Sequence, residues 1–367
     1  MTGPSLIGRA EVVPRKPAEP SSVLADRLAG RLPDLLAPVL GSGLRVGQVV
    51  PLAGGASRQT WGVGVRDGDG RQHELVLRAG DPDDPHAGTE LNAGTELNAG
   101  LELHVGMELE AASLRAAAAA GMPVPTVLRA SDDATALGCR YLISTRVPGE
   151  TIARRILRSA TGEARQRLLA QCAAALAALH AADPDSIPGL RADDPLVLLR
   201  DWMDALGQQS AVFEIALRWL RRHRPPAGGT AVVHGDFRLG NLIVDESGLA
   251  AVLDWELVHR GDPLEDLGWF CVRAWRFGED ARPAAGLGSI EDFVASYERA
   301  AGGQVDRDAL RWWQVLGTLR WGVICQRQAH RHLSGQTRSV ELAAIGRRVC
   351  ENEWDLLELL AEQGLSA

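Results

Sequence analysis

Short segments of alternating apolar and polar residues dominate the first third of the chain. The segment from Trp61 to Val65 alternates in this way, and Val46–Leu52 and Glu74–Arg78 are apolar runs with the length of a strand. The two glycines within Asp67–Gly70 indicate a turn before the last of these runs. Another strand is expected at Tyr141–Ser144. These segments predict a small antiparallel β-sheet.

Apolar residues recur at the spacing of an α-helix in the rest of the chain. Long patterns of this kind cover Glu163–His180, Asp306–His332 and Ser339–Glu362. A shorter helix is expected from Glu108 to Ala120, because Gly121 follows it. The residues that share one face of the first long helix are Leu168, Leu169, Cys172, Leu176 and Leu179.

The change from strands to helices predicts an α+β fold with two lobes. We expect a small antiparallel β-sheet N-lobe over residues 23–144 and a mostly helical C-lobe over residues 150–367. A hinge at residues 145–149 would join them. Residues 1–22 contain four prolines, and we expect them to form a flexible tail.

A six-residue repeat interrupts the N-lobe. Residues 87–92 read A-G-T-E-L-N, residues 93–98 repeat them identically, and residues 99–104 and 105–110 are degraded copies. A period of six matches neither the α-helical repeat nor a common solenoid. We interpret the insertion at 87–110 as a duplication that lengthens a surface loop or the entry to a helix. A recognition element over the cleft between the lobes is the alternative.

The composition is that of a globular protein, with 46% hydrophobic and 23% charged residues. A net charge of −8 gives a nucleic-acid partner no electrostatic support. No segment approaches the roughly 20 apolar residues of a membrane helix. We therefore expect a cytoplasmic protein with reduced thiols and no membrane partner. The scattered cysteines are Cys139, Cys172, Cys271, Cys325 and Cys350.

The main candidate for a catalytic site is the sequence H-G-D-F-R-L-G-N at residues 234–241. Two apolar segments separated by Glu246–Gly248 follow it and predict a β-hairpin. Asn241 opens the first strand and Asp254 follows the second, so their side chains can meet at one end. Amide and carboxylate oxygens suit Mg²⁺ shared with phosphate groups. Asp236, in the preceding loop, can accept a proton from a hydroxyl.

This combination supplies the parts that phosphoryl transfer requires. At average usage, H-G-D-x-x-x-x-N arises by chance in roughly one chain of this length in a thousand. These residues resemble the catalytic and metal-binding loops of the aminoglycoside phosphotransferase-like kinases, which share the protein-kinase-like fold. The resemblance implies that Asp236 is the catalytic base and that Asn241 and Asp254 bind Mg²⁺. It implies a supporting role in the loop for His234.

The resemblance also implies an ATP-binding site in the N-lobe. Gly54, Gly55, Ser57 and Thr60 lie where these kinases carry a turn that covers the phosphates. Arg78 stands where they usually carry a lysine that holds the α- and β-phosphates. Arginine keeps the positive charge, but the two side chains are not interchangeable at such a site.

Further residues complete the implied site. Glu110 is the expected partner of the N-lobe arginine, and Glu108 is its rival. Thr145 and Val147 resemble the hinge whose backbone binds adenine. Asp266, in the segment after the metal-binding loop, is expected to secure the catalytic loop. The helical half should supply the acceptor pocket, and its candidate walls are Glu256, Trp275 and Trp313.

The residues and the resemblance together predict an ATP-dependent kinase that phosphorylates a hydroxyl of a small molecule. The acceptor classes left open are aminoglycosides, amino alcohols, sugars and hydroxyacyl thioesters. The sequences of residues 235–241 and 253–256 most resemble the branch of this kinase family that is fused to acyl-CoA dehydrogenases. A nucleotide-binding pseudokinase or regulatory module is the alternative, suggested by Arg78. A metal-dependent hydrolase would need more clustered histidine and aspartate ligands.

Overall fold

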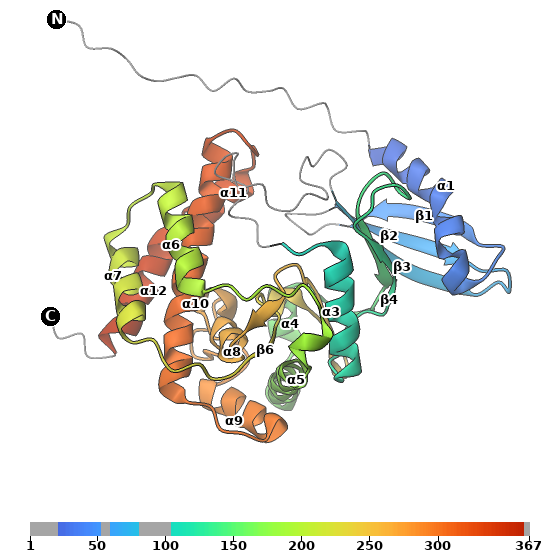
Figure 1. Ribbon diagram of the computed structural model, residues 1–367. Helices are drawn as coiled ribbons and strands as arrows, with labels where there is room; N and C mark the ends of the chain where they lie inside the picture. The colour runs from blue at the N-terminus through green and yellow to red at the C-terminus, as the bar shows by residue number, and fades with distance from the viewer. Residues whose placement is uncertain (1–20, 53–58, 81–103, 363–367) are drawn as a thin grey trace, which may run out of the picture.

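The computed structural model describes residues 21–52, 59–80 and 104–362, and it shows a β-sheet lobe beside a larger helical lobe (Figure 1). The N-lobe sheet has five strands in the order β1-β2-β3-β5-β4, and every neighbouring pair is antiparallel. The predicted α+β fold is thereby confirmed. The strands are β1 (Arg45–Pro51), β2 (Gln59–Arg66), β3 (Gln72–Ala79), β4 (Val127–Ser131) and β5 (Tyr141–Thr145).

Helix α1 (Ser21–Leu40) covers one face of this sheet, and the sequence patterns did not predict it. Leu28, Leu32 and Leu36 recur at every fourth position and are fully buried against a core that includes Trp61. The apolar face of the helix and the inward face of the sheet therefore form a separate N-lobe core. Because α1 begins at Ser21, the last two residues of the expected tail belong to a helix, and residues 1–20 lie outside the described part of the chain.

Helix α3 (Met107–Ala119) lies on the side of the sheet that faces the C-lobe (Figure 1). Its buried residues, including Met107 and Leu114, join the large core of the C-lobe. The helix therefore packs against both lobes. The two identical copies of the repeat lie within residues 81–103, outside the described residues. The last degraded copy, 105–110, provides the entry to α3 and its first turn.

The C-lobe is helical, as predicted, and its core surrounds α5, α8 and α10. One long helix was expected at Ser339–Glu362, and that expectation was wrong. The chain turns between α11 and α12, where a Cβ on Gly346 would lie 2.5 Å from the Cβ of Ala329 in α10. The helices are α4 (Ala153–Ser159), α5 (Gly162–His180), α6 (Pro195–Leu206), α7 (Ala211–Arg222), α8 (Leu264–Phe270), α9 (Ile290–Ala301), α10 (Arg307–Leu333), α11 (Val340–Gly346) and α12 (Val349–Ala361).

Two short strand pairs carry the candidate catalytic segment. Strand β6 (Ala231–Val233) pairs with β9 (His259–Gly261), and β7 (Leu242–Asp245) forms a hairpin with β8 (Gly248–Val252). The hairpin is the one predicted from the sequence. The 3₁₀ turn η2 (Leu239–Asn241) leads into it. The loops between these strands therefore lie together at one end of both pairs.

The hinge segment runs from β5 into the C-lobe and is held against β7. Glu150 and Val244 exchange two backbone hydrogen bonds, of 2.8 and 3.0 Å. Gly149 has a φ of 146°, and a Cβ there would lie 2.5 Å from the side chain of Ile243. A glycine is therefore needed for the close approach of the hinge to the catalytic hairpin.

Candidate active site

The carboxylate of Asp236 is held by three side-chain donors. Trp269 Nε1 donates to Oδ1 at 2.9 Å, and Asn241 Nδ2 donates to Oδ2 at 2.7 Å. Arg238 Nε lies 3.0 and 3.1 Å from the two oxygens. The carboxylate is 13% exposed, so it remains accessible to a small ligand. Its orientation is fixed before any ligand binds.

Asn241 and Asp254 both lie at one end of the β7–β8 hairpin. The N–H of Leu253 donates to the carbonyl of Asn241 at 2.8 Å, which brings Asp254 beside it. Asn241 Nδ2 also donates to the carbonyl of Asp236 at 2.9 Å. The amide nitrogen is thereby directed toward the catalytic loop, and the amide oxygen remains for another ligand. An amide oxygen beside a carboxylate is a donor set that suits Mg²⁺.

Arg78 of β3 forms the centre of a charged cluster between the lobes. It pairs with Glu110 of α3, and its Nη2 lies 3.0 Å from Asp254 Oδ1 and 3.6 Å from Glu256 Oε2. Burial alone would lower the pKa of Arg78, but the three carboxylates raise it above its usual value. The arginine therefore stays charged and links the N-lobe sheet to Asp254, after strand β8.

Of the two candidate partners of Arg78, the structure selects Glu110. Its side chain is fully buried, whereas Glu108 is exposed and contacts Ser131 and Asp132. Two residues along a helix point in different directions, so only one of the pair can face the sheet.

The structure places Glu256 beside Arg78 and not against the helices of the C-lobe. Its other carboxylate oxygen lies 3.4 Å from His104 Nε2. The expectation that Glu256 lines the acceptor pocket therefore gains no support from its contacts. It lies in the same charged cluster as Arg78 and Asp254.

Asp266 secures the catalytic loop from inside the C-lobe. Its two oxygens accept the backbone N–H groups of His234 and Gly235 at 2.8 and 2.9 Å. Oδ2 also lies 3.2 Å from His180 Nε2, and the other nitrogen of that ring contacts Tyr297. Burial by itself would raise the pKa of Asp266, but His180 and His234 together lower it. A buried carboxylate thus fixes the backbone immediately before Asp236.

His234 braces the same loop and makes no contact with the reacting end of Asp236. Its Nε2 lies 3.0 Å from the carbonyl of Leu253, and its Nδ1 accepts the N–H of Asp236 at 3.2 Å. The ring is fully buried. It therefore ties the catalytic loop to the end of the hairpin, which is the supporting position expected from the sequence.

A cluster of tryptophans lies beside Asp236. Trp275 packs against Trp269, and Arg238 lies 5.0 Å from the centre of the Trp275 ring. Trp275 is only 4% exposed, so an acceptor would meet Arg238 before it. Trp313 lies in the packed contact between α8 and α10, against Gly268. Its 7% exposure favours a role in packing.

Trp269 and Arg238 were not among the site residues predicted from the sequence. Arg238 is within the H-G-D-x-x-x-x-N motif, and Trp269 follows Asp266 by three residues. Residues three apart in a helix lie on the same side of it. This spacing from Asp266 was the one indication in the sequence that Trp269 lies near the catalytic loop.

The expected nucleotide-binding residues are only partly described. Gly54, Gly55 and Ser57 lie outside the described residues, within 53–58. Thr60 lies directly across from Arg78 on the neighbouring strand. Thr145 closes β5, and its Oγ1 accepts the N–H of Thr126 at 3.0 Å.

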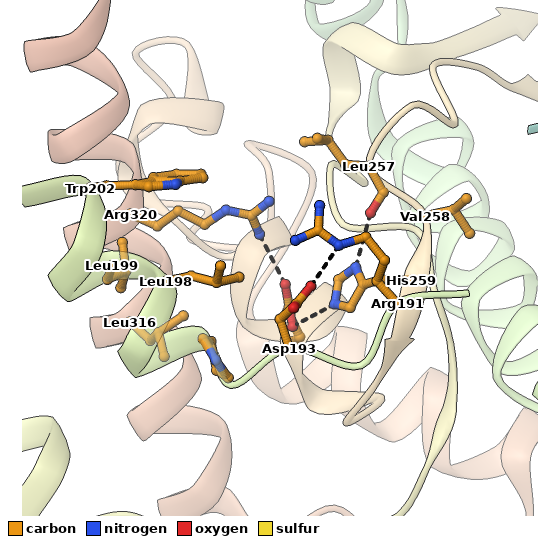
Figure 2. Close-up of a pocket in the computed structure, with 12 residues that line it drawn as sticks. Arg191, Asp193, Leu198, Leu199, Trp202, Leu257, Val258, His259, Leu316 and Arg320 are labelled. Carbon is orange, nitrogen blue, oxygen red and sulfur yellow. Dashed lines mark hydrogen bonds and ion pairs between the residues drawn. The ribbon is translucent and has the colours of Figure 1, made fainter. Parts of the chain in front are cut away.

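A cavity of about 50 Å³ lies between the helices α6 and α10 and the segment that leads into β9 (Figure 2). Apolar side chains of α6 and α10 form one side, and Leu257–His259 form the other. Arg320 pairs with Glu265 at 2.9 Å, and Glu265 pairs with His259 at 3.1 Å. Burial would lower the pKa of His259, but Glu265 raises it. Arg320 also lies over the ring of Trp269, so it connects the cavity to the base.

Two further findings concern the described residues as a whole. None of their helices is long and apolar enough to cross a membrane. They contain no group of three or more His, Cys, Asp or Glu side chains arranged to hold a metal ion. Four of the five cysteines are buried, and all five are free thiols.

Curated proteins with similar sequences are longer than this chain. Acyl-CoA dehydrogenase family member 10 of Mus musculus is 26% identical over 264 residues, which cover 66% of this chain and 25% of the mouse protein. Acyl-CoA dehydrogenase family member 11 of Gallus gallus is 30% identical over 194 residues, which cover 49% of this chain and 24% of that protein. The chain thus spans about a quarter of the length of these relatives.

Solved structures share the fold, and the family follows from the sequence. A putative aminoglycoside phosphotransferase from Ralstonia eutropha JMP134 superposes with a TM-score of 0.70 at 21% identity, over 91% of this chain and 98% of that one. A thermostable mutant of aminoglycoside phosphotransferase APH(4)-Ia, in complex with AMP-PNP and hygromycin B, gives 0.57 at 18% identity, over 92% and 100%. The profile of the phosphotransferase enzyme family matches residues 48–313. Because this match covers more than half of the sequence, the chain belongs to the phosphotransferase enzyme family.

Proposed function

We propose that this protein is an ATP-dependent kinase that transfers the γ-phosphate to a hydroxyl of a small molecule, with Asp236 as the catalytic base. The observation that carries the proposal is the double contact of Asn241 with the carbonyl and the carboxylate of Asp236. It aligns a base and a metal ligand at the end of the same hairpin that presents Asp254.

Nucleotide binding is assigned to the N-lobe sheet and the hinge. Arg78 and Thr60, across from each other on β3 and β2, would face the phosphates. The hinge backbone at Val147 would bind adenine, and no hydrogen bond occupies that backbone among the described residues. Bound Mg²⁺, held by Asn241 and Asp254, would neutralise charge on the phosphates. The APH(4)-Ia complex with AMP-PNP supports a nucleotide in this fold.

In the transfer step, Asp236 accepts the proton of the acceptor hydroxyl. The oxygen of the acceptor hydroxyl forms a bond to the γ-phosphorus as the bond to the bridging oxygen of ATP breaks, which releases ADP. The proton of the hydroxyl passes to the carboxylate of Asp236. A carboxylate offers about four acceptor positions. Trp269, Asn241 and Arg238 already donate to these positions. The acceptor hydroxyl therefore has to displace one of these donors, and Arg238 is the accessible one because its side chain is 26% exposed.

The acceptor remains one of four chemical classes: an aminoglycoside, an amino alcohol, a sugar or a hydroxyacyl thioester. The relatives named acyl-CoA dehydrogenase family members favour a metabolic hydroxyl. The choice is made by experiment, because fold similarity does not settle the substrate.

A nucleotide-binding protein without phosphotransfer is the second candidate. The observation that favours it is the ion pair between Arg78 and Asp254, which engages a proposed metal ligand. The replacement of Arg78 with lysine distinguishes an active kinase from a protein that only binds the nucleotide. A gain in phosphotransfer would mean that the arginine compromises the site, and a marked loss would mean that the site is built around it.

The direct test is phosphate transfer from ATP, with Mg²⁺, to a panel from the four acceptor classes. The proposal predicts ADP formation with at least one acceptor and its loss in Asp236→Ala. Thermal shift should show that the variant still binds ATP. Binding of ATP without transfer to any acceptor would favour the second candidate, and full turnover by Asp236→Ala would refute the assigned base.

A further inference from the structure

Trp269 is the one tryptophan among the described residues whose indole N–H contacts the proposed base. Its Nε1 donates to Asp236 Oδ1 at 2.9 Å, and its side chain is 3% exposed. By contrast, the buried indole nitrogens of several other tryptophans have no hydrogen-bond partner in the described part of the chain. These are Trp61, Trp202, Trp275, Trp313 and Trp321. Burial alone therefore does not explain the contact of Trp269.

The backbone of α8 sets the position of Trp269. The preceding residue, Gly268, lies so close to α10 that a Cβ would be 2.7 Å from the Cβ of Trp313 and 2.8 Å from its carbonyl carbon. On the other helix, a Cβ on Gly317 would lie 3.4 Å from the Trp269 ring. Two glycines thus allow α8 and α10 to approach closely, and this contact determines where the indole lies.

The indole ring of Trp269 is in contact with two other side chains. The guanidinium of Arg320 lies 5.0 Å from the centre of the ring, and Trp275 lies 5.2 Å from it at an interplanar angle of 51°. Arg320 is itself held by Glu265, so the ring has little freedom to rotate. A cation over an indole face adds a favourable electrostatic contact.

We propose that Trp269 is a positioning residue that holds the carboxylate of Asp236 in the orientation needed to accept the hydroxyl proton. The inference rests on the proposed kinase function. Arg238 has to yield its place to the acceptor, and the amide of Asn241 holds only the other oxygen, Oδ2. Trp269 is then the donor that keeps Oδ1 in place during proton transfer.

The kinetic test replaces Trp269 with phenylalanine, and in a second variant with 3-benzothienylalanine, which has the shape of tryptophan but no N–H group. We expect kcat to fall by about tenfold or more, within the roughly 10²–10⁴-fold contribution of a positioned base. The KM for ATP should stay within about threefold of that of the native protein. The control is Trp202→Phe, which removes a buried indole N–H without a partner and should leave kcat unchanged. Unchanged kcat in the benzothienyl variant would overturn the inference.

A second measurement needs no turnover, so it separates failure of this inference from failure of the proposed function. The indole resonance of Trp269 is identified in a ¹H–¹⁵N spectrum as the one lost in Trp269→Phe. We expect it to move in Asp236→Ala further than any other indole resonance, because its acceptor is removed. An unmoved resonance would show that the contact is absent in solution and would overturn the inference.

Discussion

The guanidinium of Arg78 lies 3.0 Å from the carboxylate of Asp254, so the cation of the sheet lobe directly contacts the proposed metal ligand of the helical lobe. Glu110 holds the same guanidinium from α3. The two lobes are therefore joined by charges at the place where the phosphates of ATP would lie.

Removal of the charge on Glu110 should destabilise the protein and weaken ATP binding. Glu110→Gln leaves the cation of Arg78 with only Asp254 and Glu256 as partners among the described residues. Because two carboxylates remain, we expect a loss below the roughly 3–5 kcal/mol of a buried pair broken completely. The free energy of unfolding from chemical denaturation checks this. Glu108→Gln, on the exposed side of the same helix, is the matched control and should change stability by less than about 0.5 kcal/mol. Equal effects of the two substitutions would contradict the assignment of the pair.

A Cβ at Gly149 should disrupt the contact between hinge and hairpin. Gly149→Ala would place that atom 2.5 Å from Ile243 in a backbone conformation that alanine rarely adopts. We expect a loss of roughly 1–3 kcal/mol in stability, with a lower melting temperature. Gly303→Ala is the control, because a Cβ there would have no neighbour within 4 Å. A melting temperature for Gly149→Ala equal to that of the control would show that the hinge does not need the glycine.

Asp266 should contribute stability that disappears in acid. Its pKa is lowered in the folded state, so its contribution is present above the unfolded value of about 3.9 and is lost as pH falls through the folded value. Asp266→Asn should therefore lower the melting temperature strongly at neutral pH and less below about pH 3. The exposed Asp201→Asn provides the comparison. A deficit of constant size across this range would contradict the linkage.

The pair of His259 and Glu265 should act in the opposite direction. The pKa of His259 is raised in the folded state, so its contribution is complete below the unfolded value of about 6.5 and is lost as pH rises through the folded value. We expect His259→Gln to reduce stability more at about pH 6 than at about pH 9. Melting curves of the native protein and the variant at these two pH values test this. A loss of melting temperature that grows with pH would refute the charged pair.

Most of the fold was predictable because the hydrophobic patterns of individual segments match the strands and helices that the segments form. The alternation at Trp61–Val65 and the hairpin after Asn241 both correspond to observed strands. Helix α1 was missed because it lies beside a proline-rich segment and contains Pro33 and Pro38, which normally oppose a helix. Its burial against the sheet compensates for that cost.

The motif residues of the site were predictable, whereas the contacts across the lobes were not. Spacing predicts that Asp236, Asn241 and Asp254 lie near one another, because Asn241 and Asp254 flank one hairpin and Asp236 lies in the loop before it. The contact of Glu256 with Arg78 depends on the packing of the two lobes, and that of Trp269 with Asp236 on the packing of α8 against α10. Such contacts between elements far apart in the sequence cannot be predicted from periodicity within one element.

The most direct test of the account is single-turnover phosphate transfer by Asp236→Ala, measured beside its affinity for ATP with the acceptor identified from the panel. We expect transfer to slow by about 10²–10⁴-fold, whereas the Kd for ATP should change by less than about threefold, because the base accepts a proton and does not bind the nucleotide. Transfer at the native rate would contradict the central claim.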